Sequence, residues 1–424
     1  MKKLIMKNIK NNELQISDIN FMDPKTQSCP YESYKILRDK CPVYQLPELG
    51  FYMITKYKDG RKILLEPNIF SNNPTQHENN LDEGAKAHAE IMAKHGVGSF
   101  VETLQRTDPP IHTKYRKLLN KAFTASRVKE MQPYISKVVN ELIDNFIDKG
   151  ECEFVKDYAV PIPSTIIADQ LGVPRKMLKK LKLWSDAMII SFGVASVDDM
   201  KSAAYLEAES QHYFDKVFDE KRKNPSNDII SDLVNLKFEN GDNLSNDELQ
   251  GLVAQLLAGG NETTTSSIAH GLWLLLQHPD QMKKLIENPD LIPNFVEEVI
   301  RFETPVQGLF RTVKEDTEIN ETKISKGSVL LVRYASFNRD EEIFKNPEKF
   351  DIERKDVGKH LAFGSGAHHC VGAMLARAEM KTAFKLLLER IKDIKLSKPL
   401  SDIPHSPSLY IHQLKELPIK FSKR

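Results

Sequence analysis

The sequence predicts a mainly α-helical protein with a small β region. A long helical pattern extends from Ser245 to about His278, and helical spacing also covers residues 111–150 and 175–225. Runs typical of β-strands are short and occur only in residues 40–57 and 311–332. The chain has 424 residues, of which 40% are hydrophobic, so it can bury a large core. We therefore expect one large, mostly helical domain over residues 1–424.

Charge and cysteine content restrict the classes of protein to which the chain can belong. The formal net charge is +1, which gives no bulk attraction for nucleic acid. The cysteines, Cys29, Cys41, Cys152 and Cys370, form no CxxC pair and no zinc pattern. The apolar run near the start is only Leu4–Met6, whereas a signal peptide needs about 7–15 apolar residues and a membrane span about 20. We expect a soluble, cytoplasmic protein with reduced thiols and no membrane span.

Local patterns predict the elements outside the long helix. The runs Val43–Leu46 and Phe51–Ile54 are separated by a proline and a glycine, which predicts a hairpin. Residues 1–20 are expected to be loosely ordered. Residues 74–107 are polar and weakly periodic, so we expect a long, partly helical loop. Residues 335–359 carry scattered charges and a proline, which predicts irregular structure.

The long helical pattern has a clear start and an unusual middle. Ser245 and Glu248 have the spacing of a capping box. A helix that ended near His278 would be about 50 Å long at 1.5 Å per residue. Its middle, Gly259–Thr265, contains adjacent glycines, each of which costs a helix about 1 kcal/mol relative to alanine. Such a weak, polar stretch indicates function; the alternative is a simple kink between two helices.

One cysteine lies in a glycine-rich loop, Phe363–Gly372, and is expected to open an apolar helix over Val371–Ala378. Glycines permit backbone conformations that a side chain forbids and let a flat ligand come close. A helix N-terminus favours a thiolate and lowers the pKa of the cysteine. The loop therefore predicts a site that holds the anionic sulfur of Cys370 against an electron-poor group. The alternative is a buried cysteine in a chance turn.

The pattern Phe-Gly-x-Gly-x-His-x-Cys-x-Gly resembles the haem-binding signature of the cytochromes P450. Other motifs resemble that family in the same order along the chain. They are Asp108-Pro109-Pro110-x-His112-x-x-x-Arg116, Gly259-Gly260-x-Glu262-Thr263, Glu298-x-x-Arg301, Arg311, Asn338-Arg339-Asp340 and Phe350-Asp351-x-x-Arg354. The resemblance implies the cytochrome P450 fold, with haem between the long central helix and the cysteine loop.

The resemblance also implies roles for single residues. Cys370 would be the axial thiolate ligand of the iron of heme b. The family positions that meet the haem propionates are occupied by His112, Arg116, Arg311 and His368, and Phe363 and Gly364 belong to the cofactor-binding loop. Histidine ligation of a metal by His368 and His369 was the alternative, but in the family pattern the sulfur is the ligand. Glu298 and Arg301 are expected to pair with Arg354 and to fix the geometry near the loop.

Glu262 and Thr263 match the acid–alcohol pair that the family places beside its oxygen site. A carboxylate and a hydroxyl of this kind can deliver the protons that oxygen reduction requires. The resemblance thus implies a monooxygenase that inserts one oxygen atom from O2 into an apolar substrate. Electrons would come from NAD(P)H through a separate ferredoxin or flavodoxin, and the protein would be a monomer. Two alternatives remain open, namely a peroxide-driven peroxygenase and a haem–thiolate protein that binds or senses without turnover.

The substrate is expected to meet an apolar lining. The residues at family positions that contact substrate are Phe100, Val101, Leu256, Val306, Leu309, Phe310 and Leu409, with Gln307 as a polar exception. An apolar lining is also usual for pockets in general, so it indicates a substrate class and no single compound.

Overall fold

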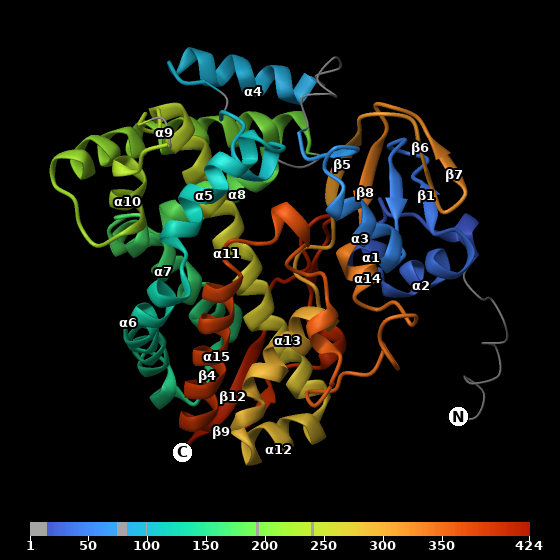
Figure 1. Cartoon of the computed structure of the whole chain (residues 1–424). Coiled ribbons are helices and arrows are strands. Elements are labelled where there is room, and N and C mark those ends of the chain that lie inside the picture. The colour runs from blue at the N-terminus through green and yellow to red at the C-terminus, as the bar shows by residue number, and fades with distance from the viewer. Residues whose placement is uncertain (1–14, 74–82, 99, 192–194, 239–240) are drawn as a thin grey trace.

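The computed structural model describes residues 15–73, 83–98, 100–191, 195–238 and 241–424. Figure 1 shows helices filling most of the molecule, with α11 passing through their middle and a sheet at one side. No helix in the part of the chain described is both long and apolar enough to cross a membrane. The helices are α1 (Pro24–Ser28), α2 (Tyr31–Lys40), α3 (Tyr57–Leu65), α4 (Glu83–Lys94), α5 (Ile111–Ala122), α6 (Ala125–Asp144), α7 (Pro161–Gln170), α8 (Leu178–Ser191), α9 (Val197–Lys223), α10 (Ile229–Asn235), α11 (Asn246–Gln277), α12 (Pro279–Glu287), α13 (Ile292–Phe302), α14 (Tyr334–Phe337) and α15 (Ala373–Arg390).

The strands fall into four small sheets, of five, three, two and two strands. The five-stranded sheet has the order β1-β2-β8-β5-β3, the three-stranded sheet has the order β4-β12-β9, and β6–β7 and β10–β11 are hairpins. The strands are β1 (Val43–Gln45), β2 (Tyr52–Ile54), β3 (Phe70–Ser71), β4 (Glu151–Glu153), β5 (Leu309–Val313), β6 (Thr317–Ile319), β7 (Thr322–Ile324), β8 (Val329–Val332), β9 (Ile391–Leu396), β10 (His405–Ser406), β11 (Gln413–Leu414) and β12 (Pro418–Lys423).

The long helix forms as one continuous element. Ser245 is its N-cap, and both hydrogen bonds of the capping box with Glu248 are present. Helix α11 then continues without interruption through the adjacent glycines to Gln277. The alternative of two helices joined by a kink is therefore wrong. The weak middle remains helical because most other residues of α11 are buried and packing outweighs low propensity.

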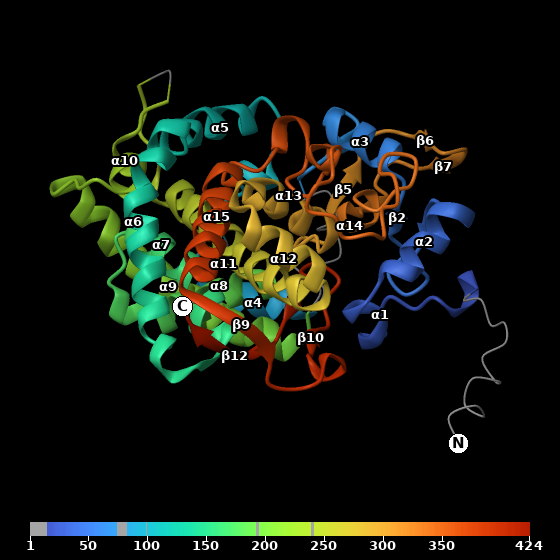
Figure 2. The same ribbon diagram turned by 90° about the horizontal axis from the view of Figure 1, so that it is seen from below.

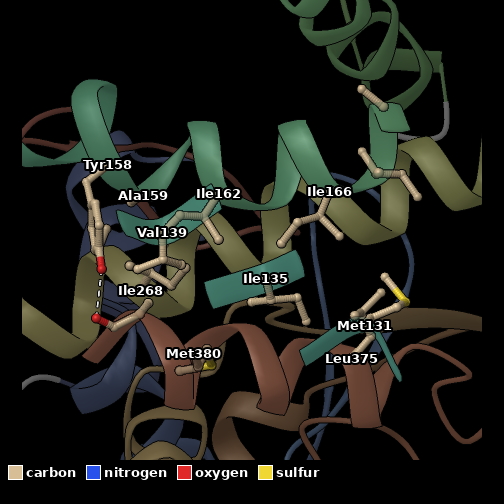
Figure 3. Packing of buried hydrophobic residues seen from close by; sticks show 14 of the residues in the cluster. Met131, Ile135, Val139, Tyr158, Ala159, Ile162, Ile166, Ile268, Leu375 and Met380 are labelled. Carbon is tan, nitrogen blue, oxygen red and sulfur yellow. Dashed lines mark hydrogen bonds between the residues drawn. The ribbon is translucent and has the colours of Figure 1, made fainter. Parts of the chain in front are cut away.

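The main hydrophobic core surrounds α11. Figure 3 shows Ile135 and Val139 of α6 facing Ile162 of α7, with Met380 of α15 below them. Tyr158, between β4 and α7, lies in the same core and donates a hydrogen bond of 2.7 Å to the carbonyl of Ala383. Packing against α6 and α7 thereby holds α11 and α15 in place. These are the two helices that border the site described below.

The expected hairpin and the expected second β region belong to one sheet. Strands β1 and β2 pair antiparallel, with Val43 opposite Ile54, which confirms the hairpin. Strand β8 then pairs parallel with β2, with Tyr52 opposite Leu330, and antiparallel with β5. Local sequence patterns did not indicate that residues 40–57 and 311–332 meet, nor did they predict the C-terminal sheets. Figure 2 shows β9 and β12, which pair antiparallel, side by side near the C-terminus.

Three sequence-based expectations need correction or restriction. Residues 1–14 of the expected loose segment lie outside the described residues, but Ile16–Asp18 form a turn of 3-10 helix and Ile19 is buried. The region 74–107 is partly helical as expected, since residues 83–94 form the regular helix α4 and Leu104–Arg106 a turn of 3-10 helix, while 74–82 and 99 are not described. The helix after the cysteine begins at Ala373 and ends at Arg390, not at Val371 and Ala378, because Gly372 is its N-cap and its apolar residues continue to Leu388.

A buried charge cluster holds the segment that leads to the cysteine loop. Glu298 is fully buried and accepts hydrogen bonds from Arg301 at 2.7 Å and from Arg354 at 3.2 Å. Arg301 also donates to the carbonyl of Asn338 at 2.7 Å, and the Asn338 side chain accepts from the backbone of Leu361 at 2.7 Å. The expected pairing is therefore present. Its contacts are structural, since they join α13 to the chain just before the loop.

Candidate functional site

The cysteine loop has a backbone path that requires glycine. The N–H of Cys370 donates to the carbonyl of Phe363 at 2.8 Å and closes the loop. Gly364 and Gly366 both have φ of +70°, a region that L side chains rarely adopt. A Cβ at Gly366 would also lie 2.8 Å from the carbonyl oxygen of Leu64 in α3. The loop can thus present Cys370 from a tight turn pressed against α3.

The sulfur of Cys370 faces an internal cavity at the N-terminus of α15. The backbone N–H groups of Gly372 and Ala373 donate to it, as the helix terminus predicts. Burial nevertheless raises the pKa of the Cys370 thiol, and these donors together with Arg116 and Arg377 offset only part of that rise. The expectation of a lowered pKa is therefore wrong for the protein alone. A positively charged partner at the sulfur would favour the thiolate further.

The cavity lies between the cysteine loop and the weak middle of α11. Phe363, Gly364 and Cys370 border it on one side, and Gly259 and Thr263 border it on the other. A Cβ added at Gly259 would meet nothing within 4 Å, so the helix backbone is open to the cavity there. The space is suited to a flat group that approaches the helix backbone closely.

A cationic, hydrogen-bonding rim completes the cavity. His112 and Arg116 from α5, Arg311 from β5 and His368 from the loop all border it. The rings of His112 and His368 have centroids 4.1 Å apart, and the Nε2 atom of each is buried with no hydrogen-bond partner among the described residues. Burial, together with the neighbouring His112 and Arg311, lowers the pKa of His368 to about 3. Neutral imidazoles and two guanidinium groups can donate to an anionic oxygen placed between them.

The two residues expected to handle protons point in different directions. Thr263 borders the cavity, and its hydroxyl donates to the carbonyl of Gly259 at 2.7 Å. Glu262 is buried outside the cavity lining, where Lys182 of α8 lies 2.9 Å and Gln413 of β11 2.5 Å from its carboxylate. Lys182 also binds Asp186 at 2.6 Å. The structure thus brings Thr263 to the site and connects Glu262 to a charged path toward the surface.

Sequence reasoning missed the residues that support the loop from α13 and α15. Arg377 lies over the ring of Phe363, 4.3 Å from its centroid, and donates two hydrogen bonds to Glu297 at 2.6 and 2.7 Å. His360 contacts the same carboxylate at 3.0 Å. Burial opposes the ionised form, but hydrogen bonds from His360 and Arg377 lower the pKa of Glu297 to about 2. The available signal was the position of Arg377 in the first turns of α15, because helical side chains lean toward the N-terminus.

The part of the cavity away from the rim is largely apolar. Leu256, Val306 and Leu309, three of the residues expected to contact substrate, border it. Phe310 instead packs between Phe51 and Tyr410, with ring centroids 5.5 Å from each. The other expected residues also lie outside the lining; they are Phe100, Val101, Gln307 and Leu409.

Glu379 of α15 is a further cavity residue that the sequence did not indicate. Its side chain is buried, and its Oε2 atom has no hydrogen-bond partner in the part of the chain that the structure describes. Burial raises the pKa of the Glu379 carboxyl to about 8. The group is therefore protonated in the folded protein at neutral pH, whereas in the unfolded chain it is ionised.

This difference predicts a pH dependence of stability. The pKa of Glu379 is higher in the folded state, so its contribution is complete below about pH 4.3 and is lost as the pH rises toward 8. The loss has a slope of up to about 1.4 kcal/mol per pH unit. Glu379→Gln should flatten the decline of the urea midpoint between pH 5.5 and 8, and Glu389→Gln, an exposed change on the same helix, should not. An unaltered pH profile in Glu379→Gln would contradict the assignment.

Comparison with known proteins identifies the class to which this fold and site belong. The family model for cytochrome P450 matches residues 82–415. The cytochrome P450 monooxygenase PikC of Streptomyces venezuelae is 33% identical over 414 residues, which cover 96% of this chain and 95% of that protein. The chain belongs to the cytochrome P450 family. It is accordingly an oxidoreductase of the P450 monooxygenase class, a family of haem–thiolate proteins.

Solved structures show the same fold. Cytochrome P450 CYP109Q5 from Chondromyces apiculatus has a TM-score of 0.83 at 34% identity, covering 97% of this chain and 100% of that one. CYP109E1 from Bacillus megaterium, solved in complex with testosterone, has a TM-score of 0.82 at 31% identity and covers 94% of this chain and 99% of that one. The predicted fold class is therefore confirmed.

Proposed function

We propose that this protein inserts one oxygen atom from O2 into an apolar small molecule, with haem held by Cys370. The observation that carries the proposal is the cavity between α11 and the loop, which places the sulfur of Cys370 opposite Gly259 and Thr263. The proposal treats residues 1–424 as one haem domain. A thiolate ligand pushes electron density onto haem iron and favours O–O cleavage, which is the chemistry that the bound group supplies.

The residues around the cavity fit haem on two counts. Its iron needs a thiolate, and Cys370 is the cysteine that borders the cavity. Its propionates need donors, and the unpartnered Nε2 atoms of His112 and His368 lie beside Arg116 and Arg311. In this assignment Cys370 holds the iron, the four rim residues hold the propionates, and Phe363 and Gly364 form the wall on the sulfur side.

Thr263 and Glu262 are proposed to deliver protons for the reduction of O2. The Thr263 hydroxyl donates to the carbonyl of Gly259, which leaves its oxygen lone pairs available to hold a water in the cavity. Glu262 lies one residue away and contacts Lys182, which in turn contacts the partly exposed Asp186. Rotation of the Glu262 carboxylate from Lys182 toward the cavity would carry a proton from this path to the water at Thr263.

The substrate is proposed to be a compact apolar molecule. Leu252, Leu256, Val306 and Leu309 give the cavity an apolar lining. They leave few polar partners for a substrate, so burial of apolar surface would drive binding. A terpenoid, a steroid or a fatty chain fits this description, and the related CYP109E1 was solved in complex with testosterone.

Electrons are proposed to come from NAD(P)H through a ferredoxin or flavodoxin. Lys114, Lys117 and Lys121 of α5 are exposed and follow at i, i+3 and i+7, so they form one basic helix face. The same helix carries Arg116, which also donates to the carbonyl of His369 in the cysteine loop. An acidic partner attracted to this face would therefore dock near the cysteine side of the cavity.

Reversal of this charge should slow the delivery of electrons. The variant Lys114→Glu/Lys117→Glu/Lys121→Glu should lower the rate of reduction by a ferredoxin at low salt and leave substrate-induced spectral shifts intact, because steering acts on encounter. Reversal of Lys381, Lys385 and Lys392, which belong to α15 and β9 and not to α5, serves as the control. Equal reduction rates for wild type and the α5 variant at low ionic strength would exclude this docking face.

Turnover separates the proposed function from its two alternatives. Compounds that shift the spin state of the haem would first be selected by titration, and each would then be supplied with NADH, a surrogate ferredoxin system and O2. A monooxygenase consumes NADH and forms product in an O2-dependent manner. Efficient product formation from hydrogen peroxide without a reductase would indicate a peroxygenase, and spectral shifts without product would indicate a sensor.

A further inference from the structure

Three histidines gather at a place that the proposed reaction does not use. His270 lies on α11, two turns beyond Thr263, while His405 belongs to β10 and His412 directly precedes β11. Their ring centroids are 4.8 Å apart for His270 and His412, 4.8 Å for His405 and His412, and 5.5 Å for His270 and His405. One nitrogen from each ring lies within 4.8 Å of the others. None of the three borders the cavity above Cys370.

Two of these rings present a buried nitrogen without a partner. His270 is fully buried and His412 is 1% exposed. The Nε2 atom of His270 and the Nδ1 atom of His412 are enclosed by protein and receive no hydrogen bond in the described part of the chain. Buried polar atoms are normally satisfied, because a missing partner costs their full desolvation. Both atoms are therefore available to a ligand that the described residues do not supply.

The opposite nitrogens of the same two rings are held as in a metal site. Nδ1 of His270 lies 2.9 Å from the carbonyl of Ser266, and Nε2 of His412 lies 3.0 Å from the carboxylate of Glu303. A carbonyl and an ionised carboxylate can only accept, so each of these nitrogens carries the proton. The unpartnered nitrogens are then left with free lone pairs. Histidine ligands of metals typically donate their second N–H to a carbonyl or carboxylate in this manner.

The neighbourhood of Glu303 keeps its carboxylate available for that role. Tyr31 donates to it at 2.6 Å and Arg339 at 3.2 Å. These donors fix the carboxylate beside the Nε2 atom of His412.

We propose that His270, His405 and His412 bind one zinc ion, which fastens the β10–β11 hairpin to α11. Imidazole nitrogens suit zinc, and a site with three histidines leaves a fourth position for water. Zn–N bonds of about 2.0–2.1 Å in a tetrahedron place the nitrogens about 3.3 Å apart. The present separations of up to 4.8 Å therefore have to shorten. His405 is only partly buried on a two-residue strand, so it is the ring that moves most.

The position of the site gives zinc a structural consequence. Ser266 of α11 donates to the carbonyl of His412, and Gln413, the next residue, donates to Glu262 at 2.5 Å. A metal shared by α11 and the hairpin would restrain both contacts. Backbone hydrogen exchange in residues 405–414 should therefore slow when zinc binds.

The test uses the untagged haem protein after treatment with a chelator and reloading with Zn²⁺ alone. Elemental analysis after desalting should find one zinc per chain, and X-ray absorption at the zinc edge should show nitrogen neighbours at about 2.0–2.1 Å with no sulfur. His405→Asn should weaken zinc binding by tenfold or more and abolish the slowed exchange in residues 405–414. The matched control is His212→Asn, which changes an exposed histidine of α9 that does not belong to the cluster.

These measurements decide the proposal even if a variant does not fold, because the X-ray absorption spectrum at the zinc edge is recorded on the wild-type protein. Zinc that desalting removes completely from wild type would overturn the site. So would sulfur in the first coordination shell, or an equal affinity in His405→Asn and wild type. One retained zinc, nitrogen ligands and the loss of affinity in His405→Asn alone would establish it.

Discussion

Cys370→Ser should abolish the red-shifted Soret band that the reduced, CO-treated wild-type protein is expected to show. That band reports a thiolate opposite CO, and Cys370 is the cysteine whose sulfur faces the cavity. A serine hydroxyl keeps the size of the side chain but supplies no thiolate. The loop should remain folded, because the hydrogen bond from the Cys370 N–H to the carbonyl of Phe363 involves only the backbone. The measurement is the difference spectrum of the variant at equal haem content.

The remaining cysteines provide matched controls. Cys29→Ser, Cys41→Ser and Cys152→Ser should each keep the band. Burial raises the pKa of all three thiols, that of Cys152 to about 12, so they are protonated at neutral pH. A red-shifted band in Cys370→Ser, or its disappearance in one of the controls alone, would show that the ligand has been assigned to the wrong residue.

Thr263→Ala should divert electrons from product to hydrogen peroxide. The change removes the hydroxyl that faces the cavity, together with its bond to the Gly259 carbonyl. Haem content, substrate binding and NADH consumption should persist, while product formed per NADH consumed should fall severalfold. Thr265→Ala is the control, because its hydroxyl points to the carbonyl of Ala159 instead of the cavity. An unchanged product ratio in Thr263→Ala would make this residue a packing threonine.

Glu262→Gln should act in another way. The amide cannot release a proton, so turnover should fall by about tenfold or more. Complete loss of acid–base assistance typically costs about 10²–10⁴-fold, but water can partly substitute for the carboxyl group. The loss should not come from unfolding, because Lys182 keeps Asp186 as a partner at 2.6 Å and is partly exposed. The quantities to compare are the turnover number and the product ratio. Turnover at the wild-type rate would exclude Glu262 from the proton path.

The sequence correctly predicted the features that depend on local backbone chemistry. The capping box at Ser245, the glycine-rich loop at Cys370 and the hairpin around residues 43–54 all formed as expected. Each of these features is specified by residues close together in the chain. The burial that raises the pKa of the Cys370 thiol was not visible, because it depends on elements that are distant in sequence.

Long-range packing decided the features that the sequence did not reveal. Glu262 precedes Thr263 by one residue, or about 100° around the helix, so the two side chains leave α11 in different directions. Glu262 is held outside the cavity lining by Lys182 and Gln413, which come from α8 and the C-terminal hairpin. The approach of His270 to His412 has the same origin. The spacing of His270 and His412 in the sequence matches no metal-binding motif, because α11 and the C-terminal hairpin meet only in the folded chain.

The origin of the inserted oxygen atom tests the central proposal most directly. An apolar compound that shifts the haem spin state would be incubated with the protein, NADH, a ferredoxin system and O2 labelled with heavy oxygen, in ordinary water. The monooxygenase assignment predicts one heavy oxygen atom in each molecule of oxidised product. The Cys370→Ser variant should form no product under the same conditions. A product that carries oxygen from water or from added unlabelled peroxide, with no label from O2, would contradict it.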